Sequence, residues 1–224
     1  MLVSTLEYLS HLTVGAVLLA SIIGLVRYRQ LPPSLRWLLL LACFDLAMEL
    51  AAIITYRVLH VNNLFLIPFI TVGELVLLSL AYRQALQSAR FGRALPWLLG
   101  LFSTYALLES VLQLGLVRHA VPLEIINDLL QIGLAFLYFQ KLLNELRVAR
   151  LLHDAFFWVS VALAVHGLGS LLISLSSNYI LTHCSVQLQQ LVLWGLLTLF
   201  NLFLYVAYCL ALWMRPRRAN VHSA

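Results

Sequence analysis

The chain has 224 residues, of which 62% are hydrophobic and 10% are charged, and its mean hydropathy is +0.95. Soluble domains carry roughly a quarter charged residues, so this composition excludes a soluble globular protein and indicates a membrane protein. We attribute the formal net charge of +5 to membrane topology and to attraction for anionic lipid. The expected partner is therefore the lipid bilayer and not a nucleic acid.

Seven apolar segments, each about long enough to cross a bilayer, make up most of the chain. In order they cover residues 5–26, 35–56, 64–86, 95–116, 123–143, 155–175 and 187–213. Because about 20 apolar residues span the hydrocarbon core as a helix, the sequence predicts an all-α, polytopic membrane protein with a seven-transmembrane-helix bundle. The connections are short, so residues 1–224 are predicted to form a single seven-helix domain. The first segment lacks the flanks of a signal peptide and is predicted to be a retained helix.

The basic residues fall on alternate connections between these segments. They form four groups of three: Arg27, Arg29 and Arg36; Arg83, Arg90 and Arg93; Lys141, Arg147 and Arg150; and Arg215, Arg217 and Arg218. Only Arg57 and Arg118 lie on the other connections. Short basic loops stay cytoplasmic. We therefore predict a multi-pass protein of the cell membrane (inner or plasma membrane), with the N-terminus outside and the C-terminus in the cytoplasm.

Each odd-numbered segment also ends in an aromatic residue followed by a basic one. The instances are Tyr28 with Arg29, Tyr82 with Arg83, Tyr138 with Lys141, and Trp213 with Arg215. Duplicated helical hairpins would produce this pattern. An aromatic belt and a basic anchor at one membrane interface explain it equally well.

Ionisable residues inside the segments carry the functional information, because a charge at the centre of a membrane helix costs about 2.5 to 3.5 kcal/mol. They are Asp45, Glu49, Glu74, Glu109 and Asp128, accompanied by His166 and Asn201. Such residues are expected to face one another or water. Gly167 and Gly169 flank His166 and are expected to permit close helix contact.

Helical spacing supports convergence of these residues, since an inward face recurs every three or four residues. The predicted polar stripes are Asp45, Glu49 and Tyr56; Tyr105, Glu109 and Gln113; Glu124, Asp128 and Gln131; His166, Ser170 and Ser174; and Gln190, Trp194, Thr198, Asn201, Tyr205 and Tyr208. The cytoplasmic halves of the second and third segments are mostly apolar. The sequence therefore predicts a polar cavity that opens outward and is closed below.

No Lys lies in the interior of a span, since Lys141 is at the end of the fifth, and no Arg lies near the midplane. The acids therefore lack an obvious permanent counter-charge and could bind a proton, a cation or a small ligand. The candidate binding residues are Asp45, Glu49, Glu74, Tyr105, Glu109, Gln113, Asp128, Gln131, His166 and Asn201. The alternative is that these groups are neutral hydrogen-bonding contacts between helices. No span carries a His-x-x-x-His or Glu-x-x-His pair, so neither a metal site nor a cofactor is predicted.

The layout resembles receptor-like and sensor membrane modules, including those fused to some bacterial histidine kinases. The stretch 63–83, with its Glu74, resembles small uncharacterised bacterial seven-helix proteins. This resemblance implies a sensor-like or regulatory membrane subunit with a separate cytoplasmic or membrane signalling partner. Two alternatives stay open: a proton- or cation-coupled small-solute transporter, and a membrane-embedded hydrolase that uses Ser170 or a metal-bound water. No catalytic motif supports the hydrolase, so no catalytic residue is assigned.

Overall fold

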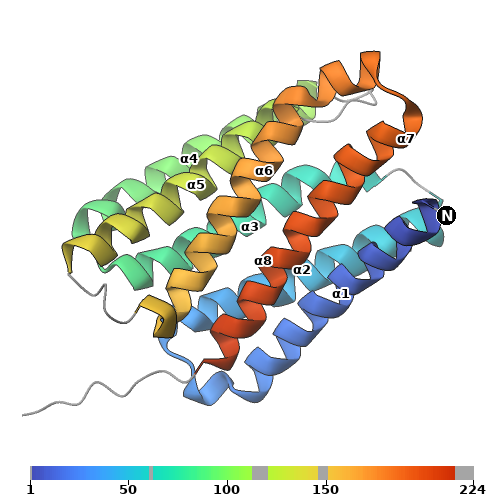
Figure 1. Cartoon of the computed structure of the whole chain (residues 1–224). Helices are drawn as coiled ribbons and strands as arrows, with labels where there is room; N and C mark the ends of the chain where they lie inside the picture. Colours follow the sequence, from blue (N-terminus) through green and yellow to red (C-terminus); the bar gives the residue numbers. More distant parts are fainter. Residues whose placement is uncertain (1, 61–62, 113–120, 146–150, 215–224) are drawn as a thin grey trace, which may run out of the picture.

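The computed structural model describes residues 2–60, 63–112, 121–145 and 151–214. Within these ranges the fold is all-α, with no strand. The first six spanning helices are α1 (Leu2–Val26), α2 (Pro33–Arg57), α3 (Ile67–Leu86), α4 (Ala89–Leu112), α5 (Val121–Asn144) and α6 (Ala155–His183). The seventh consists of α7 (Val186–Gln189), a π-helical stretch (Gln190–Leu196) and α8 (Leu197–Trp213). Figure 1 shows them as one elongated bundle.

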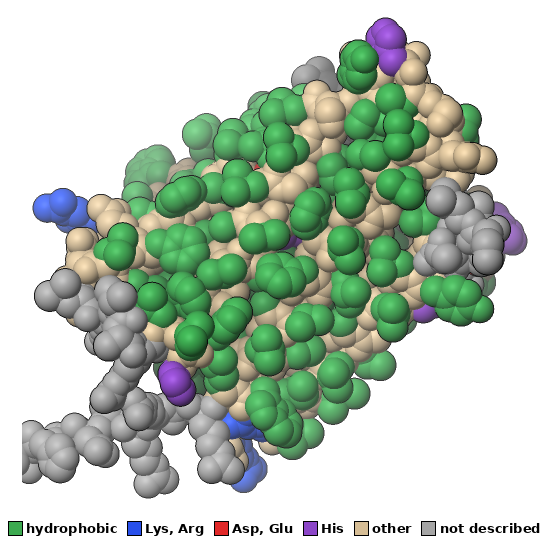
Figure 2. All heavy atoms as spheres, viewed as in Figure 1, with side chains coloured by type: hydrophobic (Ala, Val, Ile, Leu, Met, Phe, Trp, Pro, Cys, Tyr) green, Lys and Arg blue, Asp and Glu red, His purple; other side chains and the backbone are tan. Residues whose placement is uncertain are grey.

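In the described part of the chain, seven helices of 20 to 29 residues are long and apolar enough to cross a membrane. Their outer surface is apolar as well: hydrophobic side chains cover the face of the bundle drawn in Figure 2. Large side chains such as Trp97 and Leu101 are more than three-quarters exposed, which water would penalise and lipid would not. These features confirm the prediction of a helical, multi-pass membrane protein with seven candidate spans.

Helix packing leaves α4 at the edge of the bundle. Close neighbours are α1 with α2 and α8, α2 with α3, α5 with α6, and α6 with α8. Helix α4 packs mainly on α3 and is the least buried of the spanning helices. Side chains on α4 are therefore poorly placed to reach the centre of the bundle.

The described basic residues mark one end of the bundle, which we call the basic end. It contains the C-termini of α1, α3 and α5 and the N-termini of α2 and α4, with Arg29, Arg36, Arg83, Arg93 and Lys141. In Figure 2 the blue side chains lie only toward this end. Within the described ranges, Arg57 is the one basic residue at the opposite, far end. The predicted groups at 118, 147, 150, 215, 217 and 218 lie outside the described residues.

Two predicted helix boundaries are wrong. Helix α4 begins at Ala89 and not at residue 95, so Pro96 lies inside the helix and Arg90 and Arg93 lie in its first turns. The backbone N–H of Phe91 donates to the Ser88 hydroxyl oxygen at 3.5 Å, which supports an earlier start. Proline removes one backbone donor, and membrane helices tolerate that loss.

Helix α6 continues to His183, beyond the predicted end at residue 175. The polar run that suggested an end satisfies its own hydroxyl groups within the helix. Ser176 Oγ donates to the Leu172 carbonyl at 2.7 Å, and Thr182 Oγ1 donates to the Asn178 carbonyl at 2.9 Å. Because these bonds run back to the preceding turn, the helix carries a serine-rich stretch without breaking.

The π-helical stretch changes which residues of the seventh helix face inward. A π-turn bonds i to i+5, so residues on its two sides do not follow one α-helical stripe. Trp194, predicted to face inward, is 71% exposed, whereas Tyr205 and Tyr208 are buried. Gly195 instead lies against the side chain of Leu6. The predicted stripe is therefore wrong at Trp194.

The aromatic residues at the helix ends also divide into two kinds. Tyr28 and Trp213 are exposed, as an aromatic belt requires. Tyr82 is fully buried, and its hydroxyl hydrogen-bonds Ser160 Oγ at 2.7 Å. The rings of Tyr138 and Phe156 pack around it, with centroids 6.1 and 5.6 Å away. These three rings form the aromatic cluster, a part of the core in the basic half, so the belt explanation covers only half of the repeat.

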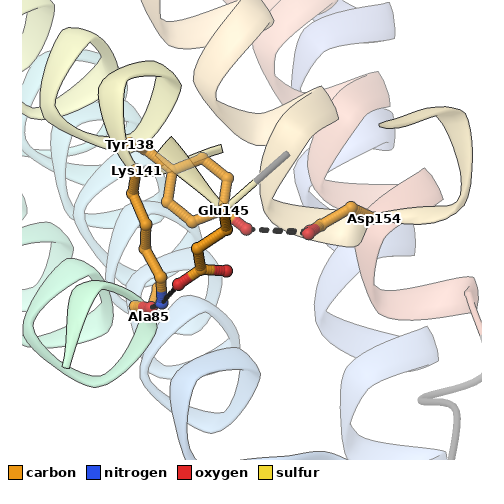
Figure 3. A network of polar contacts seen from close by, with 5 residues as sticks. All are labelled: Ala85, Tyr138, Lys141, Glu145 and Asp154. Atoms are coloured by element: carbon orange, nitrogen blue, oxygen red, sulfur yellow. Dashed lines mark hydrogen bonds and ion pairs between the residues drawn. The ribbon is translucent and has the colours of Figure 1, made fainter. Parts of the chain in front are cut away.

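Polar contacts near the basic end join α3, α5 and α6 (Figure 3). The Tyr138 hydroxyl donates to both carboxylate oxygens of Asp154, at 3.0 and 2.9 Å. Asp154 is also the N-cap of α6, since it accepts from Phe156 N–H at 2.9 Å. Lys141 donates to the Ala85 carbonyl at 2.6 Å and pairs with Glu145 at 3.6 Å. This end of the bundle is tied together by partnered polar groups.

Candidate functional site

A cavity of about 30 Å³ lies between α2, α3, α5, α6 and α8, near the middle of each helix. Its polar lining consists of Asp45, Glu74, Gln131, His166, Asn201, Tyr205 and Tyr208, and its apolar lining of Leu41, Leu78, Leu163 and Leu204. A water molecule needs roughly 10 to 15 Å³ by the same measure. The cavity therefore has room for about two water molecules or one small ion.

The two acids reach the cavity because they lie on or beside the inward faces of α2 and α3. Asp45 follows Leu38 and Leu41 at helical spacing, and all three side chains are buried. Glu74 precedes the buried Leu78 by one turn and is half-buried. The two carboxyl groups lie close enough to interact electrostatically. Two like-charged groups in a low-dielectric interior repel strongly unless a positive charge lies with them.

His166 and Asn201 link α6 to α8 at the cavity wall. Their side chains share a hydrogen bond of 2.9 Å between His166 Nε2 and Asn201 Oδ1. With Nε2–H donating to the amide oxygen, Nδ1 is an acceptor. It is buried and has no hydrogen-bond partner among the described residues. The pair therefore presents a hydrogen-bond acceptor to the interior.

Close helix approach beside this pair depends on glycine. A Cβ added at Gly169 would collide with the ring of Phe200 on α8, and one at Gly167 would lie 2.8 Å from Ile132 Cγ1 on α5. The predicted close contact at both glycines is confirmed. Because α6 approaches both neighbours here, His166 lies next to Asn201 and close to Gln131 across the cavity.

The buried atoms of the cavity lining that have no hydrogen-bond partner are acceptors. Asp45 Oδ1 and Gln131 Oε1 are buried without a hydrogen-bond partner in the described part of the chain, as is His166 Nδ1. The lining includes no Lys or Arg among residues that the structure describes. A buried site whose unpartnered atoms are acceptors favours a ligand that is positively charged or donates hydrogen bonds.

Tyr205 and Tyr208 bring the main donors. Their rings pack at 6.0 Å, both side chains are buried, and both interact electrostatically with Asp45 and Glu74. The predicted polar stripe of the seventh helix includes both tyrosines, whereas the predicted binding residues do not. Their spacing from Asn201, four and seven residues on, was the signal that could have included them.

Two further predicted acids lie next to the lining. Glu49, one turn from Asp45, is half-buried and interacts with both Asp45 and Glu74. Asp128, one turn from Gln131, is buried, interacts with Glu74, and lies beside the Ser170 hydroxyl. Both extend the charged region of the cavity without lining it.

Tyr105 and Glu109 do not join this group. They lie on the peripheral helix α4, and neither lines the cavity. The Tyr105 hydroxyl and the Glu109 carboxyl interact with each other. Gln113, the third residue of that predicted stripe, lies outside the described residues. The structure therefore brings Asp45, Glu74, Gln131, His166 and Asn201 together and leaves the α4 pair apart.

Within the described ranges, no group of three or more His, Cys, Asp and Glu side chains is arranged to hold a metal ion. No protein-family model, curated protein or solved structure matches this chain. The resemblance to sensor modules and to small bacterial seven-helix proteins therefore stays a prediction.

Proposed function

We propose that this protein binds a proton or another small cation between Asp45 and Glu74, and that it acts as a sensor-like or regulatory subunit in a cell membrane. One observation carries the proposal. Two carboxyl groups from different helices face one small, buried cavity whose other unpartnered atoms are acceptors. Such an arrangement is costly unless it holds a positive charge, and intramembrane acids of this kind commonly mark ion sites and proton relays.

The size of the cavity limits the ligand. A space of about 30 Å³ holds two water molecules or a single ion. A sugar, a nucleotide or a retinal-sized chromophore would require the five surrounding helices to move apart. A proton or small cation needs no such rearrangement, so it is the ligand class that the geometry favours.

Sensing is favoured over transport because buried leucines line the side of the cavity that faces the basic end. Leu41, Leu78 and Leu163 lie at the wall of the cavity, and the buried Tyr82 lies beyond them toward the basic end. A transporter requires alternating access to both sides of the membrane. The π-helical stretch of the seventh helix is the one feature that favours movement, since such stretches recur at functional sites. Coupled transport therefore remains the second candidate.

The hydrolase alternative finds less support. General-base activation of a serine requires a base within hydrogen-bond reach of the hydroxyl. Ser170 lies beside the Asp128 carboxyl, whereas His166 pairs with Asn201. Among the described residues at this site, the group beside Ser170 is thus a carboxyl and not the His that usually activates a serine nucleophile, and we do not propose hydrolysis.

Topology and partner belong to the same proposal. We place the basic end in the cytoplasm by the positive-inside rule, which puts the far end outside. A sensor of this kind would pass its signal to a cytoplasmic or membrane signalling protein. Binding at the acids would reach that partner through the helices that meet at the basic end.

The proposal is tested by measuring carboxyl protonation directly. Purified protein in nanodiscs is titrated with acid, in sodium chloride and in choline chloride, and the C=O stretch of protonated carboxyl groups is followed by difference infrared spectroscopy. We expect a signal that Asp45→Asn and Glu74→Gln each reduce and that the double variant removes. Glu7→Gln, at an exposed position of α1, is the matched control and should retain the signal. A double variant with the wild-type spectrum in both salts would refute the proposal.

A sensor and a transporter are separated by a flux assay. Proteoliposomes are loaded with a pH-sensitive dye, and a pH or sodium gradient is imposed. We expect no protein-dependent flux under the pH gradient or under the sodium gradient. Flux that Glu74→Gln abolishes would favour the coupled transporter instead.

A further inference from the structure

An acidic face runs along α5 from the far end of the bundle to the cavity. Glu124 lies in the first turn of the helix, Asp128 follows four residues later, and Gln131 three residues after that. Helical spacing of four and three places all three on one face. Glu124 is half-buried, whereas Asp128 and Gln131 are only 3% and 4% exposed. This face therefore leads from the membrane boundary into the interior.

The carboxyl groups along this face are close enough to influence one another. Asp128 interacts with Glu124 on its own helix and with Glu74 on α3, and Glu74 interacts with Asp45 on α2. Packing of α5 against both α3 and α6 brings these side chains together. The result is a series, Glu124, Asp128, Glu74 and Asp45, that ends at the cavity.

Two observations besides the acids themselves point to a ligand on this series. Asp128 Oδ2 and Gln131 Oε1 are buried and lack a hydrogen-bond partner within the described residues, and Gln131 faces the cavity. The Ser170 hydroxyl lies beside Asp128 and can donate or accept a proton. Unsatisfied buried acceptors of this kind require an explanation, and mobile protons with intervening water supply one.

The side of the cavity toward the basic end is lined differently. Between the cavity and the basic end lie the buried leucines Leu41, Leu78 and Leu163, followed by Tyr82, whose hydroxyl is held by Ser160 at 2.7 Å. Hydroxyl groups also lie on this side, since Tyr208 lines the cavity and interacts with Tyr82. A phenol gives up its proton far less readily than a carboxylic acid does, so these groups are a poorer route for protons than the acids on α5. Access to Asp45 and Glu74 is therefore easier from the far end than from the basic end.

We propose that the ligand of the Asp45–Glu74 pair is the proton, and that it reaches the pair from the far end along Glu124 and Asp128. This inference rests on the proposed function. Each transfer breaks the O–H bond of one carboxylic acid and forms an O–H bond on the next carboxylate, directly or through a water molecule. No oxidation or reduction takes place, and one net proton moves inward.

Other titratable groups face the central pair from the helices packed around it. They are Glu49 on α2, His166 on α6, and Tyr205 and Tyr208 on α8. None of them lies on α5 or leads toward its first turn. On α4, Tyr105 and Glu109 interact with each other. These groups set the proton affinity of the Asp45–Glu74 pair. Glu124 and Asp128 set how fast the pair is protonated and from which side.

The experiment is a pH jump applied to one face of proteoliposomes, with the carboxyl C=O signal of the central pair followed over time. Cys184 is the C-cap of α6 and lies at the far end of the bundle. Its reaction with a membrane-impermeant maleimide therefore identifies vesicles whose far end faces outward. We expect fast protonation when the acid is added at the far end. Asp128→Asn and Glu124→Gln should each slow it by on the order of tenfold or more, with an unchanged final signal. Glu7→Gln, at the same end but on α1, should leave the rate unchanged.

Several outcomes overturn the inference while leaving the proposed function intact. Equal rates from both faces, or wild-type rates in both α5 variants, would remove the route. A signal that depends on sodium and not on pH would replace the proton by a metal cation. If Asp128→Asn does not fold, Glu124→Gln, at a half-buried position in the first turn, still decides the question. If the wild-type protein shows no carboxyl C=O signal from the central pair at equilibrium, the proposed function itself is refuted.

Discussion

The basic half of the bundle, the half next to the basic end, differs from the centre in whether its buried polar groups have hydrogen-bond partners. In the basic half, Tyr82 is hydrogen-bonded to Ser160, Tyr138 to Asp154, and Lys141 to a backbone carbonyl. From the centre toward the far end, buried oxygens of Asp45, Asn127, Asp128 and Gln131 have no hydrogen-bond partner among the described residues. Ser79, next to the cavity residue Leu78 in the sequence, is the exception on the basic side, because its buried hydroxyl has no partner among the described residues.

This difference indicates which part of the bundle contributes stability and which part contributes function. A buried, partnered polar group stabilises or is neutral, whereas an unpartnered one costs roughly 1 to 3 kcal/mol. A protein keeps such groups where water, a proton or an ion completes them. The basic half is accordingly expected to supply the stability of the bundle, and the centre its chemistry. The following predictions test that division, from the largest effect to the smallest.

Removing the ring of Tyr82 should produce the largest loss. Tyr82→Ala deletes a fully buried ring that packs edge-on against Tyr138 and Phe156. We expect destabilisation of about 3 to 5 kcal/mol, measured by thermal unfolding in detergent. Tyr82→Phe keeps the ring and loses only the bond to Ser160, so it should cost about 1 kcal/mol. Equal effects of the two variants would contradict the assigned importance of the ring.

Crowding the contact between α6 and α8 should come next. Gly169→Ala places a methyl group against the ring of Phe200, which must move. We expect a loss of about 1 to 3 kcal/mol, together with a disturbed hydrogen bond between His166 and Asn201. Gly133→Ala is the matched control, because a Cβ there meets nothing within 4 Å. Unchanged melting of Gly169→Ala would show that the two helices are not held this closely.

Removing the N-cap of α6 should have a moderate effect. Asp154→Ala removes the acceptor for both Phe156 N–H and the Tyr138 hydroxyl. Loss of a cap typically costs about 1 kcal/mol. The melting temperature should fall while proton binding at the central pair persists. A variant that melts normally but fails to bind protons would reverse the roles that we assign to the two halves.

The smallest effect, and the opposite sign, is expected at the centre. Asp45→Asn replaces a buried acid that has an unpartnered oxygen with a neutral side chain of similar shape. We expect stability at neutral pH to be unchanged or to rise by up to about 1 kcal/mol, while the protonation signal is reduced. Marked destabilisation would show instead that Asp45 is a structural contact between helices.

The polar contacts in the basic half could be predicted only in part. The sequence singled out Tyr82 and Tyr138 through their repeat with basic residues, but an interfacial belt and a buried cluster give the same pattern. Burial was decided by the partners: Ser160 and Phe156 come from α6, far away in the chain. Such contacts have no local signature, because nothing in a helix pattern says which neighbour it will meet.

Hydropathy by itself determined the number of spans and most of their limits, because the length and apolarity needed to cross a bilayer are local properties of the chain. It also identified the costly acids, since each stands out against its own helix. Only the tertiary structure decided which of them meet. Asp45 and Glu74 share a cavity, while Glu109 stays on a peripheral helix. Which helices become neighbours depends on close contacts such as that of Gly169 with Phe200. It also depends on the π-helical stretch, which changes the residues of the seventh helix that face inward.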